Sequence, residues 1–303
     1  MPAASPSPAP SAFARLVRPL LFERSGALST EKAVALALAF APLAYLSWIA
    51  ASGGLGARPV SAAIHFTGLW ALRFLVISLA VTPLRRAFSW NKLILARRTL
   101  GLAALGYALL HICLFFVDQG AARAVQEIVL RVYLVIGAVA LAILLALGLT
   151  STNAVIRRMG AQNWQRLHRL AYGAAVLGTV HFFFQSKLDV TEPALMAGAL
   201  AYLFGFRLLV RGGDAATLAR LALLAVLSAL ATAGMEAAWY GVATRVDPWL
   251  VLEVNFSFDL GPRPLWWVLA GGLAVAALTA AEQRRRPRNC STGRADPSGS
   301  RAR

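Results

Sequence analysis

The residues best suited to chemistry in this chain are its four histidines, each of which lies within or beside a long apolar stretch. An ionisable ring at membrane depth is costly in free energy, so such a residue is by default a candidate functional residue. Neutral imidazole is also a common axial ligand of haem iron. The four residues are His65, His111, His168 and His181.

The elements that must position these rings are long apolar helices. Of the 303 residues, 58% are hydrophobic and only 14% are charged, whereas soluble domains carry about 25% charged residues. Apolar runs of about 20 residues cross a hydrocarbon core roughly 30 Å thick, and continuous runs favour helices over a barrel. We therefore expect an all-α, polytopic membrane helix bundle of about eight transmembrane helices. The predicted spans are 33–51, 62–82, 100–117, 128–149, 168–185, 194–210, 216–238 and 264–281.

Basic residues orient the predicted bundle. With the N-terminus in the cytoplasm, most arginines and lysines fall on cytoplasmic loops, which is the positive-inside pattern, and eight spans place both termini in the cytoplasm. The formal net charge of +17 is spread over loops that flank the membrane. This distribution favours contact with anionic membrane lipid and argues against a nucleic-acid partner.

Two histidines are predicted to lie at matching depth. His111 is near the outer end of span 100–117 and His181 near the outer end of span 168–185, and these two spans run in the same direction. Facing imidazoles on neighbouring helices can hold one haem through both axial positions. His168 opens the same span as His181 and lies about 20 Å deeper along the helix axis. Any second haem or flavin would therefore lie near the cytoplasmic face.

The spacing of His168 and His181 leaves two arrangements open. Thirteen residues at 100° each place the two rings about 140° apart around an ideal helix. Either the helix is distorted near Gly173 or Gly178, or two cofactors lie on different sides of it. His65 begins span 62–82 at the outer surface, where it either serves the helix end or contacts a haem propionate or a partner.

Cationic and aromatic residues supply further candidates. Arg73 lies within span 62–82, where an unpaired cation costs several kcal/mol, so it either binds a haem propionate or carbonyl cluster or snorkels to the interface. Other residues are expected on the cytoplasmic side, where they either bind a phosphate or quinone head group or only set the topology. They are Arg97, Arg98, Arg157, Arg158, Asn163 and Trp164.

An ordered set of short motifs carries a resemblance to a known family. Single motifs of this kind are weak, but the ordered set with three histidines is specific. The motifs are HFTGLWALRF (65–74), VTPLRR (81–86), RRTLGL (97–102), YALLH (107–111) and TSTNAVIRRMGAQNWQRLHRLAY (150–172), followed by His181. On these residues the sequence resembles the MsrQ family of haem-binding membrane subunits, within the wider ferric-reductase-like and NADPH-oxidase-like group. The likeness extends over about residues 15–211.

The resemblance implies a metal site. In the wider group, two helices each carry two histidines and hold two stacked b-type haems. It therefore implies one haem b whose iron is bound by His111 and His181. His168 is implied as a further iron ligand, but the matching inner position of span 100–117 falls around Arg97 and Arg98. Either another group ligates the second iron together with His168, or His168 serves an FMN or quinone site.

The resemblance also implies an electron route in the bacterial inner membrane. The chain has no Gly-rich dinucleotide-binding loop, and it has no soluble segment long enough for a fused flavin/NADPH dehydrogenase domain. Electrons would therefore come from the quinone pool or from a separate cytoplasmic flavin reductase. They would leave to an MsrP-like periplasmic molybdoprotein that repairs methionine sulfoxide in proteins. The sulfoxide chemistry would belong to that partner, and this chain would be an electron-transfer subunit.

The expected organisation has four parts. Residues 1–14 are a disordered segment, 15–211 a six-helix ferric-reductase-like core, 212–283 two additional transmembrane helices, and 284–303 a basic disordered tail. Alternative functions are another ferric-reductase-like electron carrier, a proton-coupled transporter or a cofactor-free anchor. A transporter predicts inverted repeats, and no convincing repeat relates the two halves of the sequence.

Overall fold

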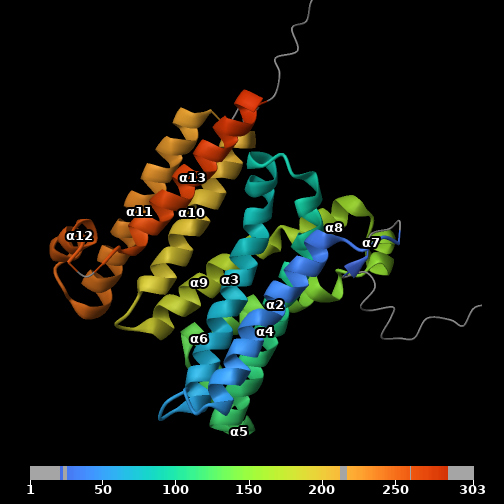
Figure 1. The fold of residues 1–303 in the computed structure, drawn as a ribbon. Helices are drawn as coiled ribbons and strands as arrows, with labels where there is room; N and C mark the ends of the chain where they lie inside the picture. Colours follow the sequence, from blue (N-terminus) through green and yellow to red (C-terminus); the bar gives the residue numbers. More distant parts are fainter. Residues whose placement is uncertain (1–20, 23–25, 212–216, 260, 286–303) are drawn as a thin grey trace, which may run out of the picture.

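Helices make up nearly all of the structure, a computed structural model that describes residues 21–22, 26–211, 217–259 and 261–285 (Figure 1). Within these residues, the one β-type pairing is an isolated bridge between Phe22 and Leu28. The predicted all-α fold is confirmed. The predicted segment 1–14 and residues 286–303 of the predicted tail lie outside the described residues.

Seven of the described helices are long and apolar enough to cross a membrane, which makes the chain a polytopic membrane protein. Helix α4 is extended at its start by a 3-10 helix, η1 (Asn91–Leu95). The seven are α2 (Thr30–Ala51), α3 (Pro59–Ala87), α4 (Ala96–Gln119), α6 (Val132–Leu149), α10 (Thr191–Arg211), α11 (Leu218–Thr244) and α13 (Pro264–Arg285).

Eight spans were predicted, and the difference is α9 (Leu170–Ser186). Its 17 residues rise about 26 Å, slightly less than a hydrocarbon core of roughly 30 Å. The predicted span 128–149 is also divided, because Arg131 adopts an extended conformation. The remaining short helices are α5 (Ala121–Leu130), α7 (Asn153–Met159), α8 (Ala161–His168) and α12 (Pro248–Phe256).

Capping residues explain where several helices begin. The Ser29 side chain accepts a hydrogen bond from the backbone of Lys32 at the start of α2, and Thr217 does the same for Arg220 at the start of α11. Asp247 caps α12, which has Pro248 in its first turn. Such caps satisfy backbone N–H groups that have no partner within the helix.

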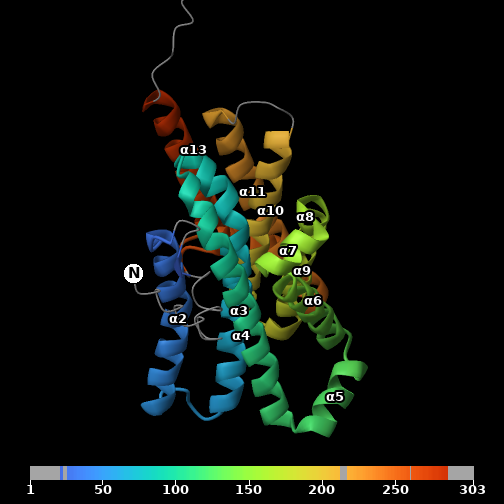
Figure 2. The ribbon, with the colours of Figure 1, turned by 90° about the vertical axis from the view of Figure 1, so that its right-hand side faces the viewer.

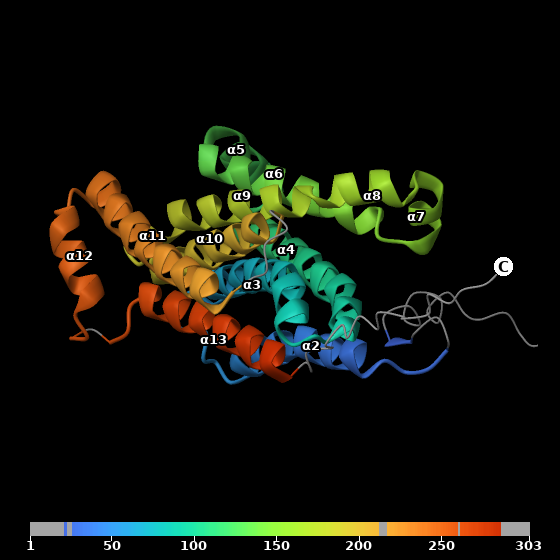
Figure 3. The same cartoon turned by 90° about the horizontal axis from the view of Figure 1, so that it is seen from above.

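Three helix pairs pack closely: α3 with α4, α6 with α9, and α11 with α13. Seen from above, α10 lies between α9 on one side and α11 and α13 on the other (Figure 3). The largest buried apolar cluster includes Phe74 and Leu79 of α3, Leu100 of α4 and Leu203 of α10. Helix α5 lies at the end of α4, where the chain turns back into α6 (Figure 2).

Candidate functional site

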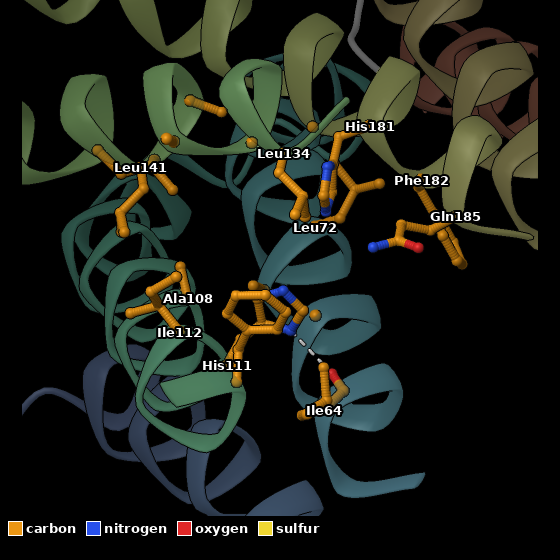
Figure 4. Close-up of a pocket in the computed structure, with 18 of the residues that line it drawn as sticks. Ile64, Leu72, Ala108, His111, Ile112, Leu134, Leu141, His181, Phe182 and Gln185 are labelled. Carbon is orange, nitrogen blue, oxygen red and sulfur yellow. Dashed lines mark hydrogen bonds between the residues drawn. The ribbon is translucent and has the colours of Figure 1, made fainter. Parts of the chain in front are cut away.

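His111 on α4 and His181 on α9 face each other across a cavity (Figure 4). Their ring centres lie 6.3 Å apart and the ring planes are nearly perpendicular, at 87°. The cavity has a volume of about 360 Å³ and is lined by residues of α3, α4, α5, α6 and α9. The matching depth expected for these two histidines is therefore seen in the structure.

Backbone carbonyls fix how each ring is presented. Nδ1 of His111 lies 2.8 Å from the carbonyl oxygen of Ile64 on α3, and Nδ1 of His181 lies 2.7 Å from that of Tyr133 on α6. Because a carbonyl oxygen can only accept, each Nδ1 must carry the hydrogen and donate it. In the neutral ring Nε2 is then the acceptor, with a lone pair free to bind a metal.

The arrangement fits a haem. Two metal–nitrogen bonds of about 2 Å each, together with the half-width of each imidazole ring, place the ring centres roughly 6 Å apart across one metal ion. The observed separation is 6.3 Å. The lining is mostly apolar and includes Leu72, Leu141 and Phe182, which suits the hydrophobic face of a porphyrin.

Besides His111 and His181, two polar side chains line the cavity, those of His65 and Gln185. His65 on α3 is exposed, and Gln185 near the end of α9 is half-buried. The structure thus brings three of the four histidines to one cavity. The predicted contact of His65 with a haem propionate stays a prediction.

His168 lies on a different helix from His181, so the prediction of one shared helix is wrong. Helix α8 ends at His168 and α9 begins at Leu170, with the break at Arg169. The break lies at neither glycine suggested by the sequence, Gly173 or Gly178. Arg169 itself has helical dihedral angles (φ −68°, ψ −22°), so α9 follows α8 directly.

His168 has its own set of neighbours, and it does not line the cavity. The Trp164 ring stacks on it at 3.8 Å. Its Nδ1 lies 3.1 Å from the Trp164 carbonyl oxygen, and its Nε2 lies 3.4 Å from Ser151 Oγ. The Ser151 hydroxyl donates to the Leu147 carbonyl at 2.7 Å, and the Leu147 backbone also hydrogen-bonds the His168 ring.

Three of the predicted cytoplasmic residues, Trp164, Arg97 and Arg98, lie near His168. Burial lowers the pKa of the His168 imidazole, the hydrogen bond to Trp164 opposes this, and the positive charges of Arg97 and Arg98 lower the pKa further. Arg98 also donates to Asn153 Oδ1 at 3.1 Å. We call His168, Trp164, Arg97 and Arg98 the basic cluster. The lowered pKa of His168 favours the neutral imidazole, which is the form that binds a metal.

Arg73 lies elsewhere. Its guanidinium donates to Glu192 at the start of α10 at 2.7 Å and lies 5.1 Å from the centre of the Trp70 ring. It does not line the cavity. The structure gives Arg73 a protein carboxylate that the sequence did not suggest, because the two residues are 119 positions apart. A role at a haem propionate stays a prediction.

The backbone partners of the two facing histidines had no sequence signal of their own. Ile64 and Tyr133 act through carbonyl oxygens, and every residue type carries that group. Which carbonyl meets each ring depends on how α3 and α6 pack against α4 and α9. Neither residue was predicted.

Comparisons with known proteins match this region. The family model described as "Ferric reductase like transmembrane component" matches residues 67–179. A protein-methionine-sulfoxide reductase heme-binding subunit MsrQ from Xanthomonas oryzae pv. oryzae (strain MAFF 311018) is 41% identical over 192 residues. These residues are 60% of this chain and 88% of the relative.

Two further relatives carry the same name. The protein from Xanthomonas campestris pv. campestris (strain 8004) is 40% identical over 207 residues, 65% of this chain and 94% of the relative. The protein from Rhodospirillum rubrum is 41% identical over 181 residues, 57% of this chain and 86% of the relative. No solved structure matches the chain.

Proposed function

The chain belongs to the MsrQ family of heme-binding subunits, and on that basis we propose that it is a membrane b-type cytochrome that carries electrons across the bacterial inner membrane. Its haem b is held by His111 and His181. The observation that carries the proposal is the pairing of two imidazoles 6.3 Å apart, each with Nδ1 bonded to a carbonyl and Nε2 free.

The chain's own residues would hold the cofactor in a dry, oriented site. Bound haem supplies a centre that takes up and releases one electron. The carbonyls of Ile64 and Tyr133 keep both rings in the tautomer that can bind iron, and hydrogen bonds of this kind raise the basicity of the ligand. The apolar lining excludes water, which affects the reduction potential of the site.

A second redox position is proposed at the basic cluster. Its cations suit a phosphate or quinone head group, and the Trp164 ring could stack against a flat cofactor. FMN, a quinone or a second haem with His168 as a ligand each fit this chemistry. The cluster is separate from the cavity, as two positions along one electron path require.

We further propose the donor and acceptor. Electrons enter from quinol or a cytoplasmic flavin reductase, and they leave to a periplasmic molybdenum-dependent protein-methionine-sulfoxide reductase of the MsrP type. The sulfoxide chemistry belongs to that partner. The names of the relatives, which are heme-binding subunits of a protein-methionine-sulfoxide reductase, support this assignment.

Topology and organisation are part of the same proposal. If α9 (17 residues) crosses the membrane as an eighth span, both termini are cytoplasmic. Residues 15–211 then form the electron-carrying core, and residues 212–283 add two helices. Anionic lipid contacts the basic cytoplasmic loops. An alternative is another ferric-reductase-like electron carrier with a different acceptor, which the family model over residues 67–179 supports equally.

Visible spectroscopy of the purified protein tests the proposal. We expect a b-type reduced-minus-oxidised spectrum and at least one haem per chain in detergent. Reduction by quinol or by a flavin reductase with NADH, followed by reoxidation with an MsrP-type protein, then tests the route. A well-folded sample without a b-type spectrum would overturn the haem proposal. Reduced haem that an MsrP-type protein does not reoxidise would favour the alternative acceptor.

A further inference from the structure

We infer that Gly68 and Gly137 are positioning residues for the two axial histidines, an inference that rests on the proposed function. Each glycine lies directly against one imidazole, and each lies four residues after the carbonyl that holds that imidazole. The same arrangement, a carbonyl at residue i and a glycine at residue i+4, therefore holds the two histidines on two different helices.

We call each glycine that leaves room for a histidine ring a glycine socket, and the first one is Gly68 on α3. A Cβ added at Gly68 would lie 2.8 Å from Nδ1 and 3.0 Å from Cε1 of His111. Carbon atoms in non-bonded contact normally approach to about 3.5–4.0 Å. The ring cannot keep this position beside any larger residue, because its Nδ1 is held at 2.8 Å from the Ile64 oxygen.

The second socket, on α6, repeats this geometry. A Cβ at Gly137 would lie 2.9 Å from Nδ1, 3.0 Å from Cε1 and 3.2 Å from Cγ of His181. The same ring donates to the Tyr133 oxygen at 2.7 Å. An unrelated pair of helices thus leaves the same space beside the same ring atoms.

Helix geometry explains the four-residue spacing. The carbonyl of residue i accepts from the N–H of residue i+4, and each Cα–Cβ bond tilts toward the helix N-terminus. A side chain at i+4 therefore lies over the carbonyl of residue i. Without a Cβ at Gly68 or Gly137, an imidazole from the neighbouring helix can reach that carbonyl. The Thr67 hydroxyl also lies 3.0 Å from the Ile64 oxygen, but its shorter contact is with the Ala63 oxygen at 2.7 Å.

An alanine variant would lose both the position of the ring and the hydrogen bond that fixes its tautomer. The added methyl group pushes the ring away from the carbonyl, and the hydrogen bond that fixes the Nδ1–H tautomer is lost. Gly68→Ala acts on His111 alone and Gly137→Ala on His181 alone. Each variant is thus expected to weaken one axial bond.

The test compares these two variants with Gly106→Ala on α4 and Gly173→Ala on α9, where an added Cβ meets nothing within 4 Å. Alanine is favoured over glycine in helices by about 1 kcal/mol, so none of the four should disrupt its own helix. The measurements are haem per chain and the spin state of the ferric haem, by electron paramagnetic resonance of the full-length protein.

We expect haem retention to fall about tenfold or more in Gly68→Ala and in Gly137→Ala, as for other losses of a ligand's hydrogen-bond partner. Any remaining haem should be high-spin, and both controls should match the wild type. Low-spin haem at wild-type content in either test variant would overturn the inference. Wild-type protein that folds but binds no haem, even when haem is supplied, would instead overturn the proposed function.

A second measurement does not depend on how the variants fold. In haem-free wild-type protein labelled with ¹⁵N-histidine, nuclear magnetic resonance should show His111 and His181 as neutral rings protonated at Nδ1. A ring protonated at Nε2 at either position would contradict the inference.

Discussion

Three histidines of this chain occupy two environments that suit different roles. His111 and His181 share a cavity and present Nε2 to it, because a carbonyl engages each Nδ1. His168 stacks on Trp164, and the charges of two nearby arginines lower its pKa. The facing pair suits a metal between two rings, whereas His168 suits a site that also binds an anionic or polar group.

The charge of Arg97 should control the titration of His168. Burial and the nearby arginines lower the pKa of this imidazole, so removing one positive charge must raise it. We expect the pKa of His168 to be higher in Arg97→Gln than in the wild type, measured by nuclear magnetic resonance of the labelled ring. Arg157→Gln, an exposed arginine on α7, serves as the control. An unchanged or lower pKa of His168 in Arg97→Gln would contradict the claim that the charge of Arg97 lowers this pKa.

The break between α8 and α9 separates His168 and His181, the two proposed redox positions, which the sequence predicted on one helix. Gly160 ends α7 with φ of +76°, a left-handed conformation that favours glycine. The chain then forms α8, which carries Trp164 and His168 on successive turns. Helix α8 ends at His168, and α9 carries His181 into the cavity.

A buried ion pair should hold α11 to the segment before α13. Glu236 on α11 is fully buried and pairs with Arg263, whose side chain is 18% exposed. Glu236→Ala leaves the arginine without its carboxylate, which we expect to lower the free energy of unfolding by roughly 3 kcal/mol. Thermal unfolding in detergent measures this, with the exposed Glu253 changed to Ala as the control. Equal stability of Glu236→Ala and the control would contradict the claim that this ion pair stabilises the protein.

Much of the molecule follows from its sequence pattern, and the exceptions have physical reasons. Long apolar runs predict helices, and parallel spans predict that His111 and His181 meet. The partner of Arg73 could not be predicted, because Glu192 reaches it only through packing of α10 on α3. The glycine sockets depend on which helix faces touch. The break at Arg169 has no proline or glycine beside it to mark it.

The cavity is built entirely from the first two thirds of the chain. All its lining residues fall between positions 64 and 185, whereas α11 and α13 pack on α10 through separate clusters that include Leu221 and Ala276. A chain truncated after Arg211 should therefore retain haem at wild-type content per chain. Its thermal stability should be lower because these contacts are lost. Haem loss in a truncated protein that keeps its helical circular dichroism would contradict this division.

The most direct test of the haem site compares haem content in three histidine variants of the full-length protein. We predict near-complete loss of haem at the cavity in His111→Ala and His181→Ala, because each removes one of the two proposed haem ligands. His168→Ala should keep that low-spin haem and accept electrons more slowly from the donor. Wild-type haem content and a low-spin spectrum in His111→Ala or His181→Ala would contradict the account.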